Sequence, residues 1–390
     1  MNESKPIDGV RLLSVSPRFF KPPIIEKLTT QKATEVVNFH QSIPGYEQTP
    51  LHSLKSFAQN IGISHVLVKD ESSRFNLQAF KVLGSSYAMA RFLQDSVKEN
   101  MKAKAITFAT ATDGNHGRGV AWSAKIFGCQ AVIYLPHGTA KRRVEAIEEL
   151  GAKAVVTTQN YDDTVRQVHN DALKYGWQII QDTATEPESI TPLRIMQGYL
   201  TMAHEIKEQL KTQELRKPTH IILQAGVGTM AAAIIGYWIN SFDIRPKFIL
   251  LEPENAACFY NSATADSEKP LVAEGSLESI MAGLCCGEPN PQAYNLIKEF
   301  TSVYLSCADY VSAEGVRILA RPLQTDPAIL AGESGSPGIG LLSLLKHSPS
   351  LRKSLAIEKN SCVLIFNTEG ITDPLTNEMI LKKNAWPSPN

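Results

Sequence analysis

Hydrophobic residues follow two alternating spacings along the middle of the chain. Short apolar runs typical of buried strands cover residues 105–109, 131–135, 154–157 and 178–181. Between them, apolar side chains recur every three or four positions, which predicts amphipathic helices over residues 117–127, 141–150 and 162–175. Strands that alternate with helices form βαβ units around a parallel sheet. The pattern therefore predicts a compact α/β domain over about residues 90–190.

A second alternation of the same kind fills the C-terminal half. Its predicted strands cover residues 220–224, 247–251 and 361–366, and its predicted helices cover 195–210, 229–239, 293–300, 312–319 and 335–345. Residues 255–290 follow no clear period, and residues 1–50 are predicted to be a loop-rich covering arm. Because 390 residues exceed the usual size of one core, we predict a large domain from 1–89 and 191–390 and a smaller one from 90–190.

Composition and charge exclude several classes of protein. The chain is 43% hydrophobic and 20% charged, with a formal net charge of zero, which is typical of a globular protein and lacks the basic field that general nucleic-acid binding requires. Residues 1–14 contain no apolar stretch typical of a signal peptide, and no run reaches membrane-spanning length. We therefore expect a cytoplasmic protein that binds neither nucleic acid nor membranes.

The six cysteines do not follow a metal-binding spacing. Reduced, mostly buried thiols are the ordinary expectation for such a set. Cys258 and Cys286 flank one irregular segment, and they would pair only if their thiols approach each other. We predict no metal site.

Lys81 is the first candidate for chemistry. It follows Phe80 and begins a helical pattern in a mainly apolar segment. Poor solvation and the positive end of a helix dipole both favour the neutral amine, so we expect a lowered pKa for Lys81. A neutral amine is nucleophilic and forms a Schiff base with an aldehyde. The alternative, and by itself the commoner case, is a surface lysine whose stem packs along a helix.

The loop over residues 110–117 connects a predicted strand to a predicted helix. Backbone amides at a helix start suit a carboxylate or another anion. Within this loop, Asp113 offers a proton acceptor and Asn115 offers both a donor and an acceptor. The alternative is an ordinary turn in which Asp or Asn caps the helix, and His116 alone is more typical of a packed histidine.

Gly226, Val227, Gly228 and Thr229 form a second loop between a strand and a helix. Its backbone amides can bind a phosphate. The same stretch also matches a dinucleotide fingerprint, with Glu252 near the position of a ribose-binding acid. A nicotinamide-dependent oxidoreductase is therefore a competing interpretation, although it leaves Lys81 and the Asp113 loop unexplained.

Residues 367–370 form a third loop after a buried strand. The neutral hydroxyl of Thr368 can hydrogen-bond a ring nitrogen without protonating it. Ordinary turn chemistry at a strand end is the alternative.

Together these motifs resemble those of the fold-type II pyridoxal-phosphate enzymes, the tryptophan synthase β-like group, and within that group the diaminopropionate ammonia-lyase family. The resemblance spans nearly the whole chain from about residue 19. Its most specific segments are residues 79–81, 107–122, 160–165, 181–184, 223–228, 280–284, 286–291, 332–335 and 368–370. The resemblance implies a two-domain α/β fold with parallel sheets flanked by helices.

The resemblance also implies roles for individual residues. Lys81 would hold pyridoxal 5'-phosphate covalently, and Phe80 would pack beside its ring. Asn115 would contact the ring hydroxyl and Thr368 the pyridine nitrogen. The phosphate would be bound by Gly226, Val227, Gly228 and Thr229. The substrate would be surrounded by Thr112, Asp113, His116 and Asp182.

The implied reaction is the α,β-elimination of 2,3-diaminopropionate, in its D and L forms, to pyruvate and two molecules of ammonia. Lys81 would be the catalytic base for one enantiomer and Asp113 for the other. The resemblance also implies a homodimer. A catalytically silent binding protein is disfavoured, because Lys81, Asp113 and Thr368 are each dispensable for folding.

One segment departs from the family pattern. After Asp182 the family usually carries a tryptophan and then a glycine-tyrosine pair, whereas this chain reads Thr185-Glu186-Pro187-Glu188-Ser189-Ile190. Loss of two aromatic residues near the substrate would widen the site or change its polarity. The alternative function is therefore a pyridoxal-phosphate-dependent lyase, dehydratase or β-replacement enzyme that acts on another β-substituted amino acid.

Overall fold

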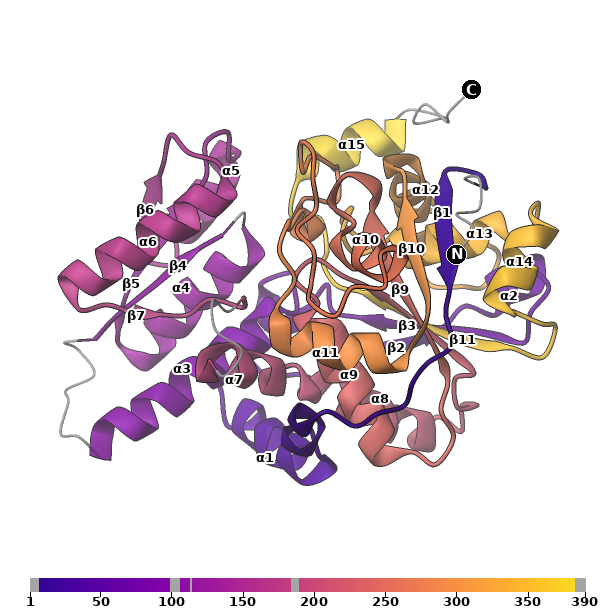
Figure 1. The fold of residues 1–390 in the computed structure, drawn as a ribbon, viewed down its shortest axis with the longest axis horizontal. Helices are drawn as coiled ribbons and strands as arrows, with labels where there is room; N and C mark the ends of the chain where they lie inside the picture. Colours follow the sequence, from indigo (N-terminus) through magenta and orange to yellow (C-terminus); the bar gives the residue numbers. More distant parts are fainter. Residues whose placement is uncertain (1–6, 99–105, 113, 184–188, 383–390) are drawn as a thin grey trace.

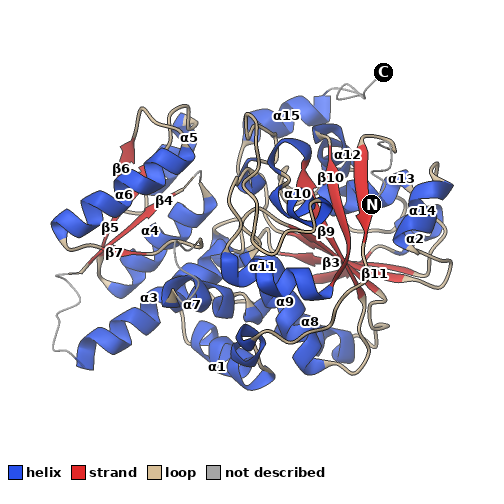
Figure 2. Ribbon diagram, viewed as in Figure 1, coloured by secondary structure: helices blue, strands red, loops and turns tan. Residues whose placement is uncertain are grey.

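A seven-stranded sheet forms the larger part of the molecule (Figures 1 and 2). The computed structural model describes residues 7–98, 106–112, 114–183 and 189–382. The strands lie in the order β1 (Val10–Ser14), β10 (Thr301–Cys307), β9 (Lys247–Pro253), β8 (His220–Gln224), β11 (Cys362–Asn367), β3 (His65–Asp70) and β2 (Leu51–Ser53). The five inner strands are parallel to one another, and the edge strands β1 and β2 are antiparallel to their neighbours.

Helices cover both faces of this sheet. The cluster on one face includes apolar residues of α1 (Thr30–Gln41), α3 (Lys81–Lys98), α7 (Ile190–Gly198), α8 (Leu200–Thr212), α9 (Thr229–Ser241) and α11 (Pro291–Phe300). The cluster on the other face includes those of α2 (Lys55–Asn60), α12 (Asp309–Ala320), α13 (Pro337–Leu344) and α14 (Pro349–Leu355). Ile221 and Leu223 belong to the first cluster and Ile222 to the second, because successive strand residues point to opposite faces.

A separate four-stranded parallel sheet lies beside the first (Figure 1). Its order is β6 (Lys153–Val156), β5 (Gln130–Leu135), β4 (Thr107–Ala111) and β7 (Gln178–Ile179), and its helices are α4 (Asn115–Phe127), α5 (Lys141–Glu148) and α6 (Tyr161–Tyr175). The predicted α/β fold of parallel sheets flanked by helices is confirmed. The domain division itself stays a prediction, and its boundary at residue 90 falls inside α3.

Several local expectations are corrected by the structure. The predicted covering arm contains β1, which pairs with the unpredicted strand β10. The helix expected over 195–210 is two helices that meet at Gly198 and Tyr199. A Cβ atom on Gly198 would lie 2.3 Å from the carbonyl oxygen of Leu83, so this position packs directly against the backbone of α3. Cys258 and Cys286 are both free thiols, and the pairing considered above is absent from the structure.

The order of the strands predicts where a ligand binds. From β8 the chain continues outward to β9 and β10, and it then returns to the other side of β8 as β11. Ligands of open α/β sheets bind outside the carboxyl ends of the strands at such a reversal. The ends of β8 and β11 are therefore the expected location of the site. Among the described residues, none of the helices combines the length and apolar character required to span a bilayer.

Candidate active site

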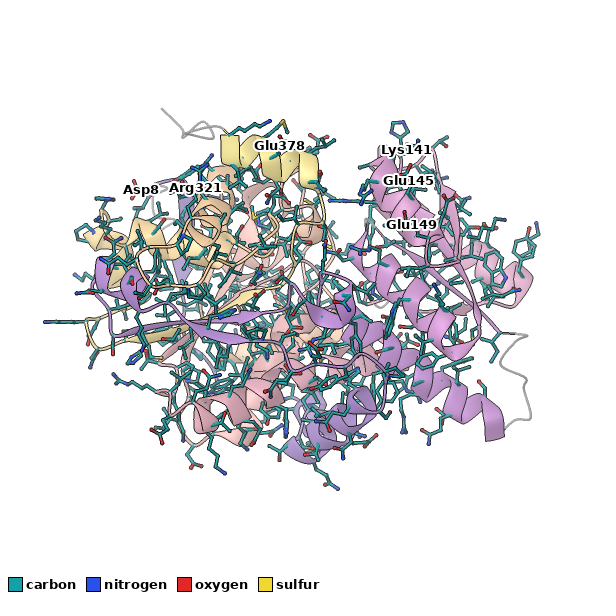
Figure 3. The ribbon with its side chains drawn as sticks, turned by 180° about the vertical axis from the view of Figure 1, so that it is seen from behind. Asp8, Lys141, Glu145, Glu149, Arg321 and Glu378 are labelled. Atoms are coloured by element: carbon teal, nitrogen blue, oxygen red, sulfur yellow. The ribbon has the colours of Figure 1, made fainter. Side chains whose placement is uncertain are left out.

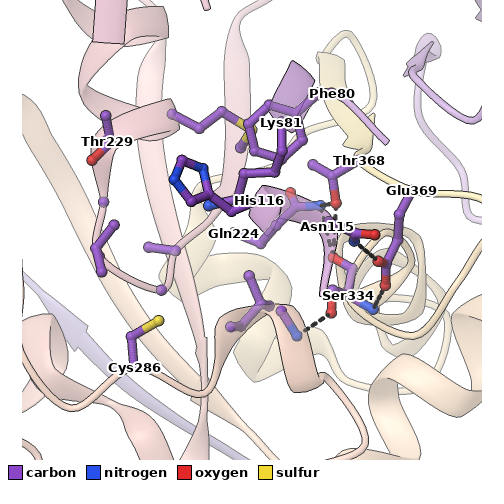
Figure 4. A pocket seen from close by; sticks show the side chains of 17 residues that line it. Phe80, Lys81, Asn115, His116, Gln224, Thr229, Cys286, Ser334, Thr368 and Glu369 are labelled. Atoms are coloured by element: carbon purple, nitrogen blue, oxygen red, sulfur yellow. Dashed lines mark hydrogen bonds between the residues drawn. The ribbon is translucent and has the colours of Figure 1, made fainter. Parts of the chain in front are cut away.

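A cavity lies at the carboxyl ends of β8 and β11 (Figure 4). It brings together three loops that are distant in the sequence, together with the N-terminal ends of α3, α4 and α9. All of the residues predicted for a cofactor line it, as does His116, which was predicted for the substrate: Phe80, Lys81, Asn115, His116, Gly226, Val227, Gly228, Thr229 and Thr368. The location agrees with the topological reversal between β8 and β11.

Lys81 enters this cavity from the first residue of α3. The preceding turn is tightly constrained, since Phe75, Asn76 and Gln78 all have left-handed backbone angles. Ala79 forms a β-bridge with Glu369, and the Phe80 amide donates to the carbonyl oxygen of Thr368 at 3.3 Å. These contacts fix the position of Lys81 relative to the loop that follows β11.

The amine of Lys81 forms an ion pair with Asp182. Lys81 Nζ lies 2.5 Å from Asp182 Oδ2, and the two side chains are 20% and 6% exposed. Burial is the largest single influence on the pKa of Lys81 and lowers it, but the charge and hydrogen bond of Asp182, together with Tyr199 and Cys286, raise the net pKa above the ordinary value. The sequence-based expectation of a lowered pKa is therefore wrong for this arrangement. It could not be foreseen because Asp182 lies a hundred residues further along the chain.

The glycine loop after β8 forms a close-fitting cradle at the start of α9. Gly228 has a φ of 85°, and a Cβ atom there would lie 2.4 Å from the Phe259 ring. A Cβ atom on Gly226 would lie 3.0 Å from Cys286 Sγ. Neither position accommodates a side chain, so the backbone amides are left accessible at the positive end of a 13-residue helix. Such a cradle suits a phosphate group.

Asn115 is oriented by Glu369. Its Nδ2 donates to Glu369 Oε2 at 2.5 Å. The same carboxylate accepts the Ser334 amide at 2.9 Å and the Thr372 hydroxyl at 3.2 Å. Asn115 begins α4, beside the smaller sheet, whereas Glu369 follows β11 of the larger one. This hydrogen bond, visible in Figure 4, therefore connects the two sheets across the cavity.

Thr368 presents a neutral hydroxyl to the cavity. Its Oγ1 donates to the Ser334 carbonyl oxygen at 3.2 Å, and it accepts from Gln224 Nε2 at 3.3 Å. Gln224 Nε2 also donates to the carbonyl oxygen of Phe366, at 2.9 Å. The hydroxyl is thus held between β8 and β11, in a position where it can hydrogen-bond a ring nitrogen.

The remaining predicted substrate residues lie in different environments. His116 is 4% exposed, and its Nε2 donates to the Ile180 carbonyl oxygen at 2.8 Å, which is typical of a packed histidine. Thr112 Oγ1 accepts the amides of Gly114 and Gly117, so it stabilises the loop and is not among the described residues that line the cavity. Asp113 lies outside the described residues. So do residues 184–188, which include most of the divergent segment from Thr185 to Ile190.

Glu252 does not occupy a ribose-binding position. It is 1% exposed, and its carboxylate accepts the backbone amides of Phe259 and Tyr260 at 2.9 and 2.8 Å. Burial raises the pKa of Glu252 to about 8. The residue stabilises the segment that leads into α10 (Cys258–Thr264) and does not line the cavity, which contradicts its role in the nicotinamide interpretation.

Several cavity residues received no role from the sequence, and those with a polar, acidic or thiol side chain are Gln224, Cys286, Ser334 and Glu369. Gln224 and Glu369 lie at or just after the ends of β8 and β11, where the parallel-sheet rule could have found them. Cys286 and Ser334 lie in irregular segments, for which the hydrophobic pattern carries no positional information.

Comparisons with known proteins point to the same kind of site as the geometry of the cavity, a site for pyridoxal phosphate. A family model described as a pyridoxal-phosphate dependent enzyme matches residues 43–365. Diaminopropionate ammonia-lyase of Escherichia coli K12 is 42% identical over 371 residues, which cover 91% of this chain and 92% of the relative. The enzyme of that name from Salmonella typhimurium is 42% identical over 360 residues, which cover 87% of this chain and 89% of the relative.

Solved structures agree as well. The E. coli diaminopropionate ammonia-lyase in complex with an aminoacrylate-PLP azomethine intermediate has a TM-score of 0.88 and 41% identity, and the match covers 96% of this chain and 97% of that one. A threonine deaminase from Solanum lycopersicum, 17% identical with a TM-score of 0.72, shares the fold. The chain therefore belongs to the fold-type II pyridoxal-phosphate-dependent enzymes and, within them, to the diaminopropionate ammonia-lyase family.

Proposed function

We propose that this chain catalyses the pyridoxal-phosphate-dependent α,β-elimination of 2,3-diaminopropionate, in its D and L forms, to pyruvate and two molecules of ammonia. The observation that carries the proposal is that Lys81, which forms an ion pair with Asp182, lines one cavity together with the glycine cradle. The 42% identity to enzymes of that name supports the choice of substrate.

The residues present fit the cofactor. Its phosphate suits the cradle of Gly226 to Thr229, because a Cβ atom at Gly226 would crowd Cys286, which lines the same cavity, and one at Gly228 would push the loop away from the Phe259 ring. Lys81 would hold it covalently, and Phe80 would pack beside its ring. Asn115 would contact the ring hydroxyl and Thr368 the pyridine nitrogen. When bound, pyridoxal phosphate supplies the electron sink that acidifies the Cα proton of an amino acid.

The chain's own residues would then move protons. The Lys81 amine would be the base on one face of Cα, and Asp113 would be the base on the other. Asp182 would hold an amino group of the substrate, since its carboxylate already binds an ammonium, that of Lys81. A protonated β-amino group leaves as ammonia more readily than a neutral one, so a carboxylate at this place favours elimination.

A second candidate keeps the cofactor and changes the substrate. The divergent segment from Thr185 to Ile190 contains Glu186 and Glu188 and lacks the aromatic residues that the family usually carries there. This difference favours a lyase, dehydratase or β-replacement reaction on another β-substituted amino acid.

We also propose that the chain acts as a cytoplasmic homodimer, with the domain division at residues 90–190 given above. The dimer is what the resemblance to the family implies, and size-exclusion chromatography with light scattering would test it.

The proposed reaction is tested by supplying each enantiomer of 2,3-diaminopropionate to the protein loaded with pyridoxal phosphate. Pyruvate is followed with a coupled dehydrogenase, and Lys81→Ala serves as the matched control. We expect pyruvate from both enantiomers and none above background from the variant. Covalently bound cofactor without pyruvate would overturn the substrate assignment and favour the second candidate.

A further inference from the structure

A second cavity adjoins the cofactor site. It lies between α4, α5 and the turn that leads to α15 (Pro374–Lys382), and it encloses about 820 Å³ of space including the part open to solvent. Asn115, Gly283 and Glu369 line both cavities. A molecule that reaches Lys81 from this side therefore passes through the second cavity, which we call the vestibule.

Arginine side chains dominate the vestibule. Arg118, Arg142 and Arg143 line it, against the two carboxylates of Glu149 and Glu369. Glu369 already accepts three hydrogen bonds, from Asn115, Ser334 and Thr372, as described above. The charge that remains available to a ligand on the described lining is therefore predominantly positive.

Arg118 points to a missing anion. It lies one helical turn after Asn115 on α4. Its Nε is buried and has no hydrogen-bond partner among the residues that the structure describes. Burial lowers the pKa of Arg118 and the nearby Arg142 lowers it further, while Glu369 and Glu149 raise it, and the net pKa lies below the ordinary value. A guanidinium with an unsatisfied buried donor beside a second guanidinium is stabilised by a bound anion.

One face of α5 presents the opposing charges at helical spacing. Arg142, Ala146 and Glu149 all line the vestibule. Their spacing of four and then three positions places them on one side of α5, with the positive Arg142 near its start and the negative Glu149 at its C-terminal end. Figure 3 labels Lys141, Glu145 and Glu149 in order along this helix and its C-terminal end. Positive and negative groups thus face the same space, which suits a small molecule that carries both charges.

We propose that the vestibule binds the carboxylate of the incoming amino acid through Arg118 and Arg142, with the ammonium of the same molecule toward Glu149. This inference rests on the proposed function for the identity of the amino acid. A zwitterion suits the site better than a phosphate, because Glu149 and Glu369 repel a dianion. The vestibule would raise the local concentration of substrate beside Lys81, and the carboxylate product, pyruvate, could bind there as it leaves.

Steady-state kinetics on diaminopropionate give the first test. Arg142→Gln should raise KM by about fivefold and Glu149→Gln should raise it by about threefold, in both cases with kcat unchanged and with effects that shrink at high salt. Lys141→Gln is the matched control, because it removes a positive charge from the same helix while its side chain is 90% exposed and paired with Glu145. An equal KM shift in Lys141→Gln and Arg142→Gln, or no shift in either, would overturn the proposal.

A second test needs no turnover. Calorimetry on the cofactor-loaded protein would use glycine betaine, a zwitterion that cannot form a Schiff base, with acetate, pyruvate and inorganic phosphate as separate arms. We expect betaine, acetate and pyruvate to bind, and Arg142→Gln to weaken each by about fivefold. Binding of phosphate alone, or carboxylate binding that Arg142→Gln leaves unchanged, would overturn the vestibule.

The two tests separate this inference from the proposed function. Carboxylate binding that depends on Arg142, without pyruvate from diaminopropionate, would sink the proposed substrate and keep the vestibule. Pyruvate formation with KM insensitive to Arg142 and Glu149 would keep the proposed function and sink the vestibule.

Discussion

Lys81 Nζ lies 2.5 Å from Asp182 Oδ2, although the lysine begins α3 and the aspartate follows β7 of the smaller sheet. The main chain of Asp182 is fixed as well, because its carbonyl oxygen accepts the Thr229 hydroxyl at 2.9 Å and the Asn290 amide at 3.0 Å. The carboxylate is thus held between the smaller sheet and the glycine cradle. It favours the protonated form of the Lys81 amine, to which the cofactor would bind in the proposed function.

Replacement of this carboxylate tests that effect. Asp182→Asn removes the charge that holds the pKa of Lys81 above its ordinary value, so the neutral amine becomes available at lower pH. We expect covalent capture of pyridoxal phosphate by the variant to shift downward by about one pH unit or more, and turnover to fall about a hundredfold. The visible absorbance of the bound cofactor, recorded against pH, measures the first effect.

The matched control for Asp182 is Asp95→Asn, which breaks an ion pair of the same length. Asp95 pairs with Arg194 at 2.5 Å, but its side chain is 43% exposed and it does not line the cavity. Cofactor capture in this variant should follow the wild-type pH dependence. The idea fails if Asp182→Asn and Asp95→Asn behave alike.

The hydrogen bond between Asn115 and Glu369 should be energetically coupled to cofactor binding. Glu369→Gln leaves the Asn115 amide without its anchoring carboxylate, so the amide no longer has one fixed orientation toward the cofactor. We expect pyridoxal phosphate to bind about tenfold more weakly to Glu369→Gln and to Asn115→Ala. Equilibrium dialysis of both variants and of the double variant measures the coupling. Losses that simply add in the double variant would show that the two residues act independently.

Two glycines with nearly the same backbone angle separate strain from crowding. Gly228 and Gly151 have φ values of 85° and 87°, but a Cβ atom meets the Phe259 ring in the first case and nothing within 4 Å in the second. Gly151→Ala should cost about 1 kcal/mol of stability from backbone strain and leave cofactor affinity unchanged. Gly228→Ala should cost more and weaken pyridoxal phosphate binding at least tenfold. Thermal unfolding and equilibrium dialysis of both variants provide the comparison, and equal effects on affinity would contradict a role for the cradle.

A buried charge network lies beneath the Lys81 turn. Glu205 accepts from Lys69 Nζ at 2.6 Å and from Arg74 Nη2 at 2.7 Å, with all three side chains at most 1% exposed. Glu205→Gln leaves two cations with one fewer partner. We expect a loss of about 3–5 kcal/mol in the free energy of unfolding at neutral pH, measured with urea. The exposed pair of Asp163 and Arg166 is the control, since Asp163→Asn should cost less than about 1 kcal/mol.

The same network predicts a pH dependence of stability. Burial raises the pKa of Glu205, but Arg74 and Lys69 lower it by more, to about 2. A carboxylate whose pKa is depressed on folding contributes stability that is fully present above its unfolded pKa, 4.5, and is lost as the pH falls through 2. The difference in stability between wild type and Glu205→Gln should therefore shrink as the pH falls below about 4.5. A difference that stays constant down to pH 2 would refute the assignment.

Strands with regular apolar runs could be predicted from the sequence. Residues 220–224 were expected as a strand, and β8 has those bounds. By contrast, β10 (Thr301–Cys307) was missed, because its serines, threonine and cysteine interrupt the apolar run although the strand is buried between β1 and β9. The break between α7 and α8 was also invisible, since it depends on the contact of Gly198 with the backbone of α3.

In the cavity, too, some features could be predicted from the sequence and others could not. Lys81, Asn115, the glycine loop and Thr368 could be named from their loops and from the resemblance, because each follows or precedes a regular element. The partners of these residues could not be derived from periodicity. Asp182 beside Lys81 and Glu369 beside Asn115 are contacts between segments more than a hundred residues apart, and such contacts depend on how the two sheets pack.

The adjacency of β8 and β11 also determines when the site can exist. Gln224 at the end of β8 is hydrogen-bonded to Phe366 in β11, 142 residues further along the chain. During synthesis on the ribosome, the glycine cradle and Lys81 are made long before Thr368. A nascent chain that ends before residue 362 lacks the central strand between β8 and β3. We therefore expect cofactor capture to follow the insertion of this last strand.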